Sequence, residues 1–457
     1  MRENVSTPHS TRASMQAFLI VWLGQFGSQV GSRMTHFSLT LWAWEITGQA
    51  TALALVGFFT QVPRLLITPF AGVIVDRWNR KQLMIVGDTV ASASTLVMLW
   101  LYRTDQLQIW HLYGAGAING AFGQIQQLAY TTSMTLMVPR RHYSRAISLN
   151  FLSGYGSNIF GPAVAGILYP VVGLSGIFLT DLGTFAIATL TVLFATIPQP
   201  NHTESHTIWY KDLAVGFHFL AHRPGMIGIL VTAALFQLTN EMANAIHAPM
   251  ILARSGSSAQ VLAIVSATAG AGGVVGAILM TVWQGPRPRI YGVLFGMVGA
   301  GFSKIGLSLS CNLGLWIPMQ FCSSFNFPIM GGSGNAIWLS KVPPEIQGRV
   351  FSISLLIKGL IAPLGRLLVG PLADRVFEPA MMPGGQLNLV FGGIFGRIFG
   401  TGKGAGIATL YGLCAVAMTI VGLGGWCYRP LRTIEANLPD YSPDYLPDYE
   451  TATERSD

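Results

Sequence analysis

The sequence predicts an all-α integral membrane protein with twelve transmembrane helices in two pseudo-symmetric six-helix halves. Three observations carry this prediction. Of the 457 residues, 51% are hydrophobic and only 10% are charged, whereas a soluble chain carries about a quarter charged residues. Apolar runs as long as the roughly 20 residues that cross a bilayer recur along the chain. A set of residues in the first half also recurs in the second half.

The apolar runs divide the chain into twelve predicted helices separated by short polar connections. Each run is bounded by charged residues, glycine or proline, which are typical of helix ends at a membrane surface. The predicted helices begin near residues 16, 50, 82, 108, 146, 174, 224, 258, 290, 313, 350 and 404.

The internal repeat is read from six residues of the fourth connection and fifth helix. Each returns after the same interval of 204 residues, without a gap. Repeats of this kind place a binding site between the two halves, near the middle of the membrane. The pairs are Val138/Val342, Pro139/Pro343, Arg145/Arg349, Ser148/Ser352, Gly161/Gly365 and Gly166/Gly370.

The repeat and the apolar runs define five segments. Residues 1–15 form a cytoplasmic N-terminus, residues 16–197 the first half and residues 224–428 the second half. Between the halves, residues 198–223 form a linker with an interfacial helix, whose apolar face is Trp209, Leu213, Phe217 and Leu220. Residues 429–457 form a disordered acidic cytoplasmic tail with three Pro-Asp-Tyr repeats.

Cations are distributed unevenly between the two sets of connections. The four short even-numbered connections hold ten and the odd-numbered ones five, which by the positive-inside rule places both termini in the cytoplasm. The net charge of +8 fits contact with anionic lipid rather than with nucleic acid. The inner set is Arg77, Arg80, Lys81, Arg140, Arg141, Arg145, Arg287, Arg289, Lys341 and Arg349; the outer set is Arg103, Arg254, Arg375, Arg397 and Lys403.

Polar stripes on three apolar helices are the candidate binding residues. Such a face does not point at lipid, so it lines a cavity or joins helices by hydrogen bonds, and both interpretations stay open. Glu241 is the candidate proton carrier because it is the carboxylate of the helix-seven stripe. The cavity candidates are Gln237, Asn240 and Asn244 on helix seven, Gln25, Gln29 and Arg33 on helix one, and Gln124 and Gln127 on helix four.

A charged connection follows helix two, with the pattern Gly72-x-x-x-Asp76-Arg77-x-x-Arg80-Lys81. This pattern resembles the signature loop of the major facilitator superfamily. The resemblance implies that helices one, four, seven and ten line a central cavity. It also implies that Asp76 belongs to a cytoplasmic latch against helix eleven. The corresponding loop of the second half, residues 284–289, has cations but no acid, so we expect one latch.

Helix five contains Gly161-Pro162 followed by Gly166, which resembles the motif of antiporter-type exporters. The chain as a whole is most similar to the bacterial branch with macrolide exporters and the enterobactin exporter. This resemblance implies a proton-coupled exporter of a small amphipathic metabolite, siderophore or drug that works by alternating access. The alternatives are a proton-coupled uptake symporter and, further away, a non-transporting sensor or channel.

The sequence does not indicate an enzyme. We find no nucleophile or metal constellation at one membrane depth and no phosphate-binding Gly-x-x-x-x-Gly-Lys loop. His202/His206 and His218/His222 have metal-compatible spacing but stand without a cysteine or acid cluster. We therefore expect no cofactor and no metal. The expected partners are a small-molecule substrate, protons and lipid, for a monomer in the bacterial cytoplasmic membrane.

Overall fold

The computed structural model describes residues 8–138, 142–195, 217–387 and 393–438, and these are almost entirely helical. The first half contributes α1 (Pro8–Thr47), α2 (Ala50–Arg77), α3 (Arg80–Arg103), α4 (Ile109–Met137) and α5 (Tyr143–Phe194). The second half contributes α7 (Pro224–Arg254), α8 (Ala259–Trp283), α9 (Arg289–Leu309), α10 (Leu313–Lys341), α11 (Pro344–Leu372) and α15 (Ala405–Cys427). Short helices η2 (Ala373–Phe377), α12 (Glu378–Met381), α14 (Ile394–Phe399), α16 (Arg429–Arg432) and α17 (Ile434–Asn437) complete the described chain.

Helix α5 contains a break that divides it into two spans. Its apolar stretch Leu152–Phe194 has 43 residues, which at 1.5 Å per residue measures about 65 Å and is twice the thickness of a hydrocarbon core. Gly173 has φ 65° and ψ −175°, a conformation that glycine adopts without strain. The predicted start of a helix near residue 174 therefore falls at this break.

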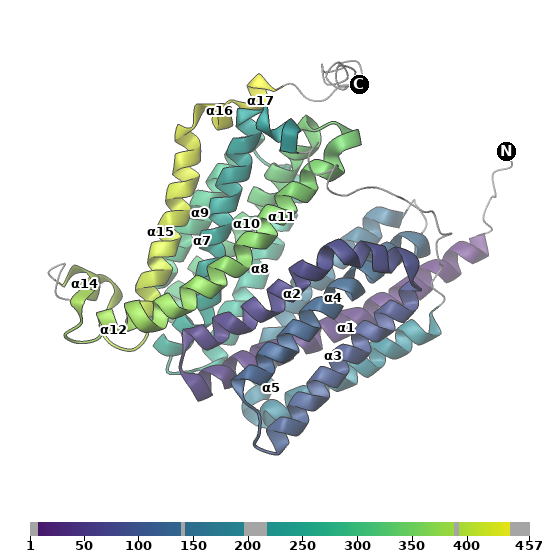
Figure 1. Cartoon of the computed structure of the whole chain (residues 1–457), viewed down its shortest axis with the longest axis horizontal. Helices are drawn as coiled ribbons and strands as arrows, with labels where there is room; N and C mark the ends of the chain where they lie inside the picture. The colour runs from purple at the N-terminus through teal and green to yellow at the C-terminus, as the bar shows by residue number, and fades with distance from the viewer. Residues whose placement is uncertain (1–7, 139–141, 196–216, 388–392, 439–457) are drawn as a thin grey trace.

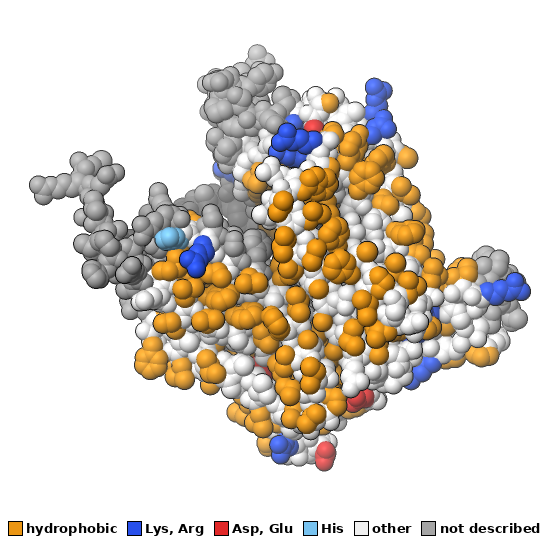
Figure 2. All heavy atoms as spheres, turned by 180° about the vertical axis from the view of Figure 1, so that it is seen from behind, with side chains coloured by type: hydrophobic (Ala, Val, Ile, Leu, Met, Phe, Trp, Pro, Cys, Tyr) orange, Lys and Arg blue, Asp and Glu red, His pale blue; other side chains and the backbone are white. Residues whose placement is uncertain are grey.

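Eight stretches of the described residues are long and apolar enough to cross a membrane by length and composition, and Leu152–Phe194 counts as one of them. On the face seen in Figure 2, apolar side chains cover the middle of the molecule and the described Lys and Arg side chains lie toward its ends. Val282 and Leu355 are typical, with 79% and 70% of their surfaces exposed. This distribution fits a protein surrounded by lipid. The number of twelve crossings remains a prediction.

The helices form two bundles that meet at one end and diverge at the other (Figure 1). We call the end at which the bundles meet the closed end. The end at which they diverge is the open end, and it carries the start of α1 together with α16 and α17. At the closed end one apolar cluster is shared between the bundles, with Leu41 and Ile177 of the first packed in the same core as Ile246 and Val265 of the second. Toward the open end each bundle has a core of its own.

The repeated glycines make equivalent helix crossings in the two halves. A Cβ on Gly161 would lie 2.3 Å from the Cβ of Arg33 on α1, and one on Gly365 would lie 3.2 Å from the carbonyl oxygen of Leu238 on α7. The later repeated glycine of each half, Gly166 or Gly370, packs against a helix of the other half. Gly166 packs on Ala263 of α8, and Gly370 packs on Thr51 of α2. Close crossings α5/α8 and α2/α11 therefore join the bundles.

The start of the predicted disordered tail is wrong. Residues 429–438 are described, and they include α16 and α17. Leu431 and Ile434 are buried against the second bundle, and the Glu435 carboxylate accepts a hydrogen bond of 3.0 Å from the Ile290 backbone N–H at the start of α9. Two apolar anchors and a helix cap explain why this segment folds. The Pro-Asp-Tyr repeats lie outside the described residues.

The predicted interfacial helix of the linker lies mostly outside the described residues, including Trp209 and Leu213. Of its predicted face, Phe217 is exposed and Leu220 is buried. These two side chains lie on a short helical segment that leads to Pro224, the first residue of α7.

Candidate functional site

The polar stripe of α7 faces two different partners in the second bundle. Glu241, which accepts a hydrogen bond from Gln237 of the same helix, contacts an arginine of α11, whereas Asn240 and Asn244 contact a lysine of α9. His247, at the end of the stripe, lies beside Tyr411 of α15, with 5.9 Å between the ring centroids. The single stripe seen in the sequence is therefore two adjoining groups.

Glu241 forms an ion pair with Arg366 of α11. Arg366 Nη2 lies 2.9 Å from Glu241 Oε2, and Nε donates to the same oxygen at 3.0 Å. Gln237 Nε2 donates to the other carboxylate oxygen at 3.0 Å. The side chains are 13% exposed for Glu241 and 25% for Arg366. Charge-assisted bonds from a guanidinium fix both groups, and the pair is partly accessible.

The same guanidinium also reaches the other bundle. Arg366 Nη1 donates to the backbone carbonyl oxygen of Gly57 on α2, at 3.1 Å. A Cβ on Gly57 would lie 2.9 Å from Arg366 Nη1, so glycine leaves room for this approach. Arg366 thus joins the carboxylate of the stripe to the opposite half of the molecule.

Lys304 of α9 is enclosed within the second bundle, with 3% of its surface exposed. Its Nζ donates to Asn240 Oδ1 at 2.9 Å and to Asn244 Oδ1 at 2.7 Å. The ammonium also lies 6.0 Å from the ring centroid of Phe327 and 5.9 Å from that of Tyr411. Amide oxygens and aromatic faces together replace part of the lost hydration.

The candidates on α1 do not form one cavity-facing stripe. Gln25 is buried, and its amide donates to Asp88 Oδ2 of α3 at 3.1 Å, while Gln126 of α4 donates to Oδ1 at 2.5 Å. Of the two interpretations left open for the stripe, this contact favours interhelical hydrogen bonding at Gln25, and its role in a cavity stays a prediction. Asp88 is 1% exposed, and the two amides compensate for the burial of its carboxylate.

Arg33 is exposed, and it is not the cation that pairs with Glu241. Arg366 occupies the position instead because the Gly365 crossing brings α11 directly onto α7. Gln29 is half-buried on the same face of α1 as Arg33.

The candidates on α4 lie near α2. Gln124 Oε1 accepts a hydrogen bond of 2.8 Å from Nε of Arg64 on α2. Gln127 is exposed, and its amide lies 3.5 Å from the hydroxyl of Thr131 one turn along the helix. The second buried carboxylate of the first bundle, Asp181, accepts hydrogen bonds from Thr35 and Thr95.

Comparison with known proteins decides the family. The sequence profile described as Major Facilitator Superfamily matches residues 21–365. The chain belongs to this superfamily. It is a multi-pass membrane transporter, and its membership of a transporter family indicates a transporter rather than an enzyme.

Curated relatives include exporters. Macrolide efflux protein A of Streptococcus pyogenes is 24% identical over 368 residues, which cover 79% of this chain and 90% of the relative. The multidrug efflux pump Tap of Mycobacterium tuberculosis is 23% identical over 378 residues, covering 78% of this chain and 87% of the relative. These relatives are consistent with the exporter branch of the superfamily.

Solved structures share the fold. A bacterial homolog of the human lysosomal transporter Spinster, in an inward-facing and unoccupied conformation, has a TM-score of 0.63 with 17% identity, covering 96% of this chain and all of that one. The nucleoside transporter NupG has a TM-score of 0.63 with 13% identity, covering 89% of this chain and 98% of its own. At these identities the likeness shows the major facilitator fold alone.

The signature loop ties the open end of the first bundle together. Asn79, not Asp76, caps α3, since its side chain accepts from the backbone N–H groups of Lys81 and Gln82. Arg80 Nη1 donates to the carbonyl of Thr132 on α4 at 3.0 Å. Lys81 Nζ donates to two carbonyls, those of Leu193 and Ala195, at the end of α5.

Asp76 stands apart from these contacts. It is exposed in the last turn of α2, and among the described residues no hydrogen bond or ion pair reaches its carboxylate. A negative charge at the C-terminal end of a helix is unfavourable. Gly72 and Arg77 occupy the same last turns of α2, and a Cβ on Gly72 would meet nothing within 4 Å.

The second half repeats the basic part of the loop. Arg289 Nη1 donates to the carbonyl of Ala336 on α10 at 3.3 Å, and Ala336 follows Thr132 by the same 204 residues. The start of α9 is capped by Glu435 of α17, whereas the start of α3 is capped by Asn79 within the loop itself. The helix-five motif lies at the two crossings described above. Gly161 of α5 packs against α1 and Gly166 packs against α8, and Pro162 lies inside α5.

Sequence reasoning could identify Arg366 and Lys304 as charges in apolar helices but did not assign them to the site, and it missed the Gly57 carbonyl. The repeat carried a signal for the first, because Arg366 follows the repeated Gly365, and a repeated glycine marks a helix crossing. Lys304 was visible as a charge in an apolar helix, but its partners on α7 depend on the tertiary packing. A backbone carbonyl gives no signal in the sequence.

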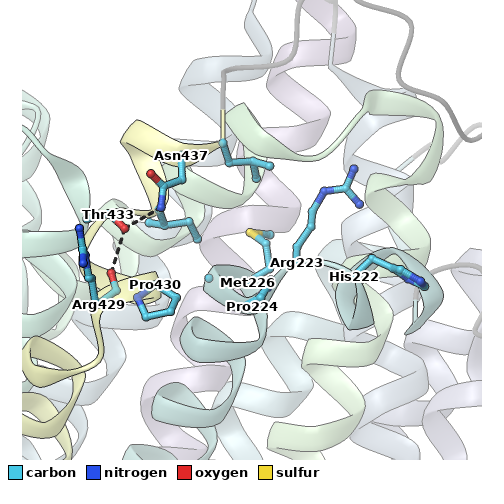
Figure 3. A pocket seen from close by; sticks show the side chains of 11 residues that line it. His222, Arg223, Pro224, Met226, Arg429, Pro430, Thr433 and Asn437 are labelled. Carbon is cyan, nitrogen blue, oxygen red and sulfur yellow. Dashed lines mark hydrogen bonds between the residues drawn. The ribbon is translucent and has the colours of Figure 1, made fainter.

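A separate cavity lies at the open end. It measures about 560 Å³ and lies between the start of α7 and the α16–α17 segment, with Arg223, Pro224, Met226, Arg429 and Asn437 around it (Figure 3). Asn437 donates to the Thr433 hydroxyl at 2.8 Å. Sixteen residues of α7, about 24 Å, separate Gly225 from Glu241, so this cavity is not part of the site.

Within the described part of the chain, no group of three or more His, Cys, Asp or Glu side chains is arranged to hold a metal. His218 and His222 lie one helical turn apart, and Nδ1 of His222 is 2.9 Å from the His218 carbonyl oxygen. His202 and His206 lie outside the described residues. The four cysteines are free thiols.

Proposed function

We propose that the protein is a proton-coupled exporter of a small amphipathic molecule, a drug, siderophore or other metabolite, that works by alternating access. The observation that carries the proposal is the position of Arg366, which binds Glu241 in its own half and the Gly57 carbonyl in the other. A proton on Glu241 neutralises the carboxylate. The charge state of one accessible side chain is thereby linked to a contact between the halves.

The coupling step follows from this geometry. With the bundles apart at the open end, Glu241 is paired with Arg366, the arrangement expected after its proton has left. Substrate then enters, and the halves rock toward the opposite state. A proton that enters from the opposite side of the membrane then binds Glu241 and weakens its ion pair with Arg366. The halves return to the starting conformation. One proton that moves down 100 mV supplies about 2.3 kcal/mol, enough for a bias of about fiftyfold.

The substrate class rests on the relatives and on the side chains near the open space. Curated relatives are named for macrolide and multidrug efflux. Arg33, Gln127 and Asn244 are exposed polar groups, and the half-buried ring of Phe26 lies 6.5 Å, centroid to centroid, from the exposed ring of Phe160. Polar and aromatic groups together suit an amphipathic molecule. Uptake symport remains the alternative.

We propose that the open end faces the cytoplasm of a bacterial cell, with twelve crossings and both termini inside. The ten-to-five distribution of cations supports this orientation. A reporter fused at residue 5 or 440 should read as cytoplasmic, and one inserted near Gln386 as external. Any other pattern would contradict the helix count or the orientation.

Transport by purified protein tests the function. In proteoliposomes with an imposed pH gradient, an amphipathic probe such as a macrolide should accumulate against its own gradient in exchange for protons, and a protonophore should abolish the accumulation. Movement of probe and protons in the same direction would favour the symporter. Equilibration without accumulation would indicate a channel, and no movement of the probe or of nucleoside and peptide controls would favour a sensor.

A further inference from the structure

The environment of Lys304 constrains the chemistry of the substrate, an inference that rests on the proposed function. Lys304 is buried within the second bundle, and its ammonium binds the side chains of two residues of the α7 stripe. The contact extends from α9 to α7, where Asn240 is buried and Asn244 is exposed. Asn244 therefore has its amide oxygen on the lysine while part of its side chain is exposed.

The orientation of both amides follows from hydrogen-bond chemistry. An ammonium group has three donors and no acceptor, so it accepts only the oxygen end of an amide as a partner. Asn240 and Asn244 each place Oδ1 within 2.9 Å of Nζ. The Nδ2 groups are consequently directed away from the lysine. At the exposed Asn244 the two N–H donors are therefore the part of the amide that is directed away from Lys304.

The charges near the α7 stripe also favour contact with hydrogen-bond acceptors. The groups of the second bundle that are placed together here are two cations, Lys304 and Arg366, and one carboxylate, Glu241. Since the carboxylate of Glu241 is already paired with Arg366, the positive charge of Lys304 is not neutralised within this group of three. This charge lies next to Asn244. A cation bound to an amide oxygen also polarises the amide and strengthens its N–H donors.

We propose that Lys304 is a positioning residue that turns Asn244 into a donor-only contact, so that the transporter selects substrates rich in hydrogen-bond acceptors over cations without acceptors. Carbonyl, hydroxyl, ether and carboxylate oxygens match two N–H donors. A quaternary cation gains nothing from them and is repelled by the ammonium behind. The cavity wall of α7 therefore favours neutral or anionic oxygen-rich molecules.

Binding of two probes to the purified protein tests the proposal. Chloramphenicol is neutral and carries amide, hydroxyl and nitro oxygens, whereas tetraphenylphosphonium is a cation without acceptors. The wild type should bind chloramphenicol at least tenfold more tightly. Lys304→Met should weaken chloramphenicol binding about tenfold, the equivalent of one hydrogen bond, and should leave tetraphenylphosphonium binding unchanged or tighter. Lys304→Arg, which keeps the donors, should retain the preference.

A second variant distinguishes the loss of the Asn244 N–H donors from a loss of the folded structure. Asn244→Asp has the same size and still pairs with Lys304, but it has no N–H donor, so it should lose chloramphenicol affinity in a protein that remains folded. The proposal is overturned if the wild type binds tetraphenylphosphonium as tightly or binds no chloramphenicol, or if Lys304→Met weakens both probes equally. Binding is measured without a pH gradient. The binding results therefore test the role of Lys304 separately from the test of proton-coupled export.

Discussion

Glu241→Gln is expected to abolish accumulation driven by a pH gradient while leaving exchange down the substrate gradient near the wild-type level. Glutamine has the same size as glutamate, and its carbonyl oxygen can still accept a hydrogen bond from Arg366. It carries no charge and binds no proton. The loss should bring accumulation in proteoliposomes to the level of the protonophore control, a fall of tenfold or more.

The alternative interpretation of Glu241 is a fixed structural contact between α7 and α11. In that case glutamine would preserve most of the function, since the geometry of the hydrogen bonds survives. Asp181→Asn is a matched control, because Asp181 is also a carboxylate within a helix bundle, held by the hydroxyls of Thr35 and Thr95. Undiminished accumulation in Glu241→Gln together with a loss in Asp181→Asn would transfer the proton-carrying role to the first bundle.

Arg366 should respond differently from its partner. Arg366→Gln leaves a carboxylate that is 13% exposed without a cation, and removal of one partner from a buried pair costs up to about 3–5 kcal/mol. The single variant should therefore be less stable than Glu241→Gln, and the double variant should recover part of the stability. The thermal midpoint of the purified proteins measures this difference.

Much of the fold could be predicted from the sequence because membrane helices are set by local patterns. The predicted starts at residues 50, 224 and 313 coincide with α2, α7 and α10, and the others lie within a few residues except at α1 and α11. Helix α11 begins at Pro344, six residues early, because proline is favoured in the first turn of a helix. The polar start of α1 obscured the fact that this helix extends beyond the apolar run.

The candidate site could be predicted only in part. A stripe on one helix shows which side chains avoid lipid, but not which helix they meet. Gln25 and Gln29 share a stripe, yet Gln25 is buried against Asp88 and Gln29 is only half-buried. The partner of Glu241 depended on the crossing of α7 and α11, and thus on long-range packing. Asp374 was missed altogether, since its partners are backbone N–H groups of another helix.

Asp374→Ala is expected to shift the protein toward the state in which the closed end separates. Asp374 lies in η2, at the end of α11, and its carboxylate accepts from the backbone N–H groups of Ala50 and Thr51 at 3.0 and 2.7 Å and from the Thr51 hydroxyl at 2.5 Å. Gln49, at the N-cap of α2, makes no capping bond itself. A residue of one half therefore caps a helix of the other.

A helix cap contributes about 1–2 kcal/mol, and a loss of that size changes an equilibrium by about 5- to 30-fold. Spin labels at the exposed positions Gln106 and Thr401, in a chain without the native cysteines, would report the distance across the closed end. Glu378→Ala is the matched control. Its carboxylate also caps a helix, through Gly404 and Ile407, but α15 belongs to the same half, so its loss should not change the distance distribution.

Asp76 lies at the C-terminal end of α2, beside the open end, just as Asp374 follows the C-terminal end of α11 at the closed end. Pro343, at the N-cap of α11, makes no capping bond itself. By the pseudo-symmetry of the halves, Asp76 should cap α11 when the open end closes, as Asp374 caps α2 now. Asp76→Asn should then favour the present state, and combined with Asp374→Ala it should restore the short distance at the closed end. If the double variant shows the same distribution as Asp374→Ala alone, Asp76 does not oppose Asp374, and the two helix ends do not act as alternating latches.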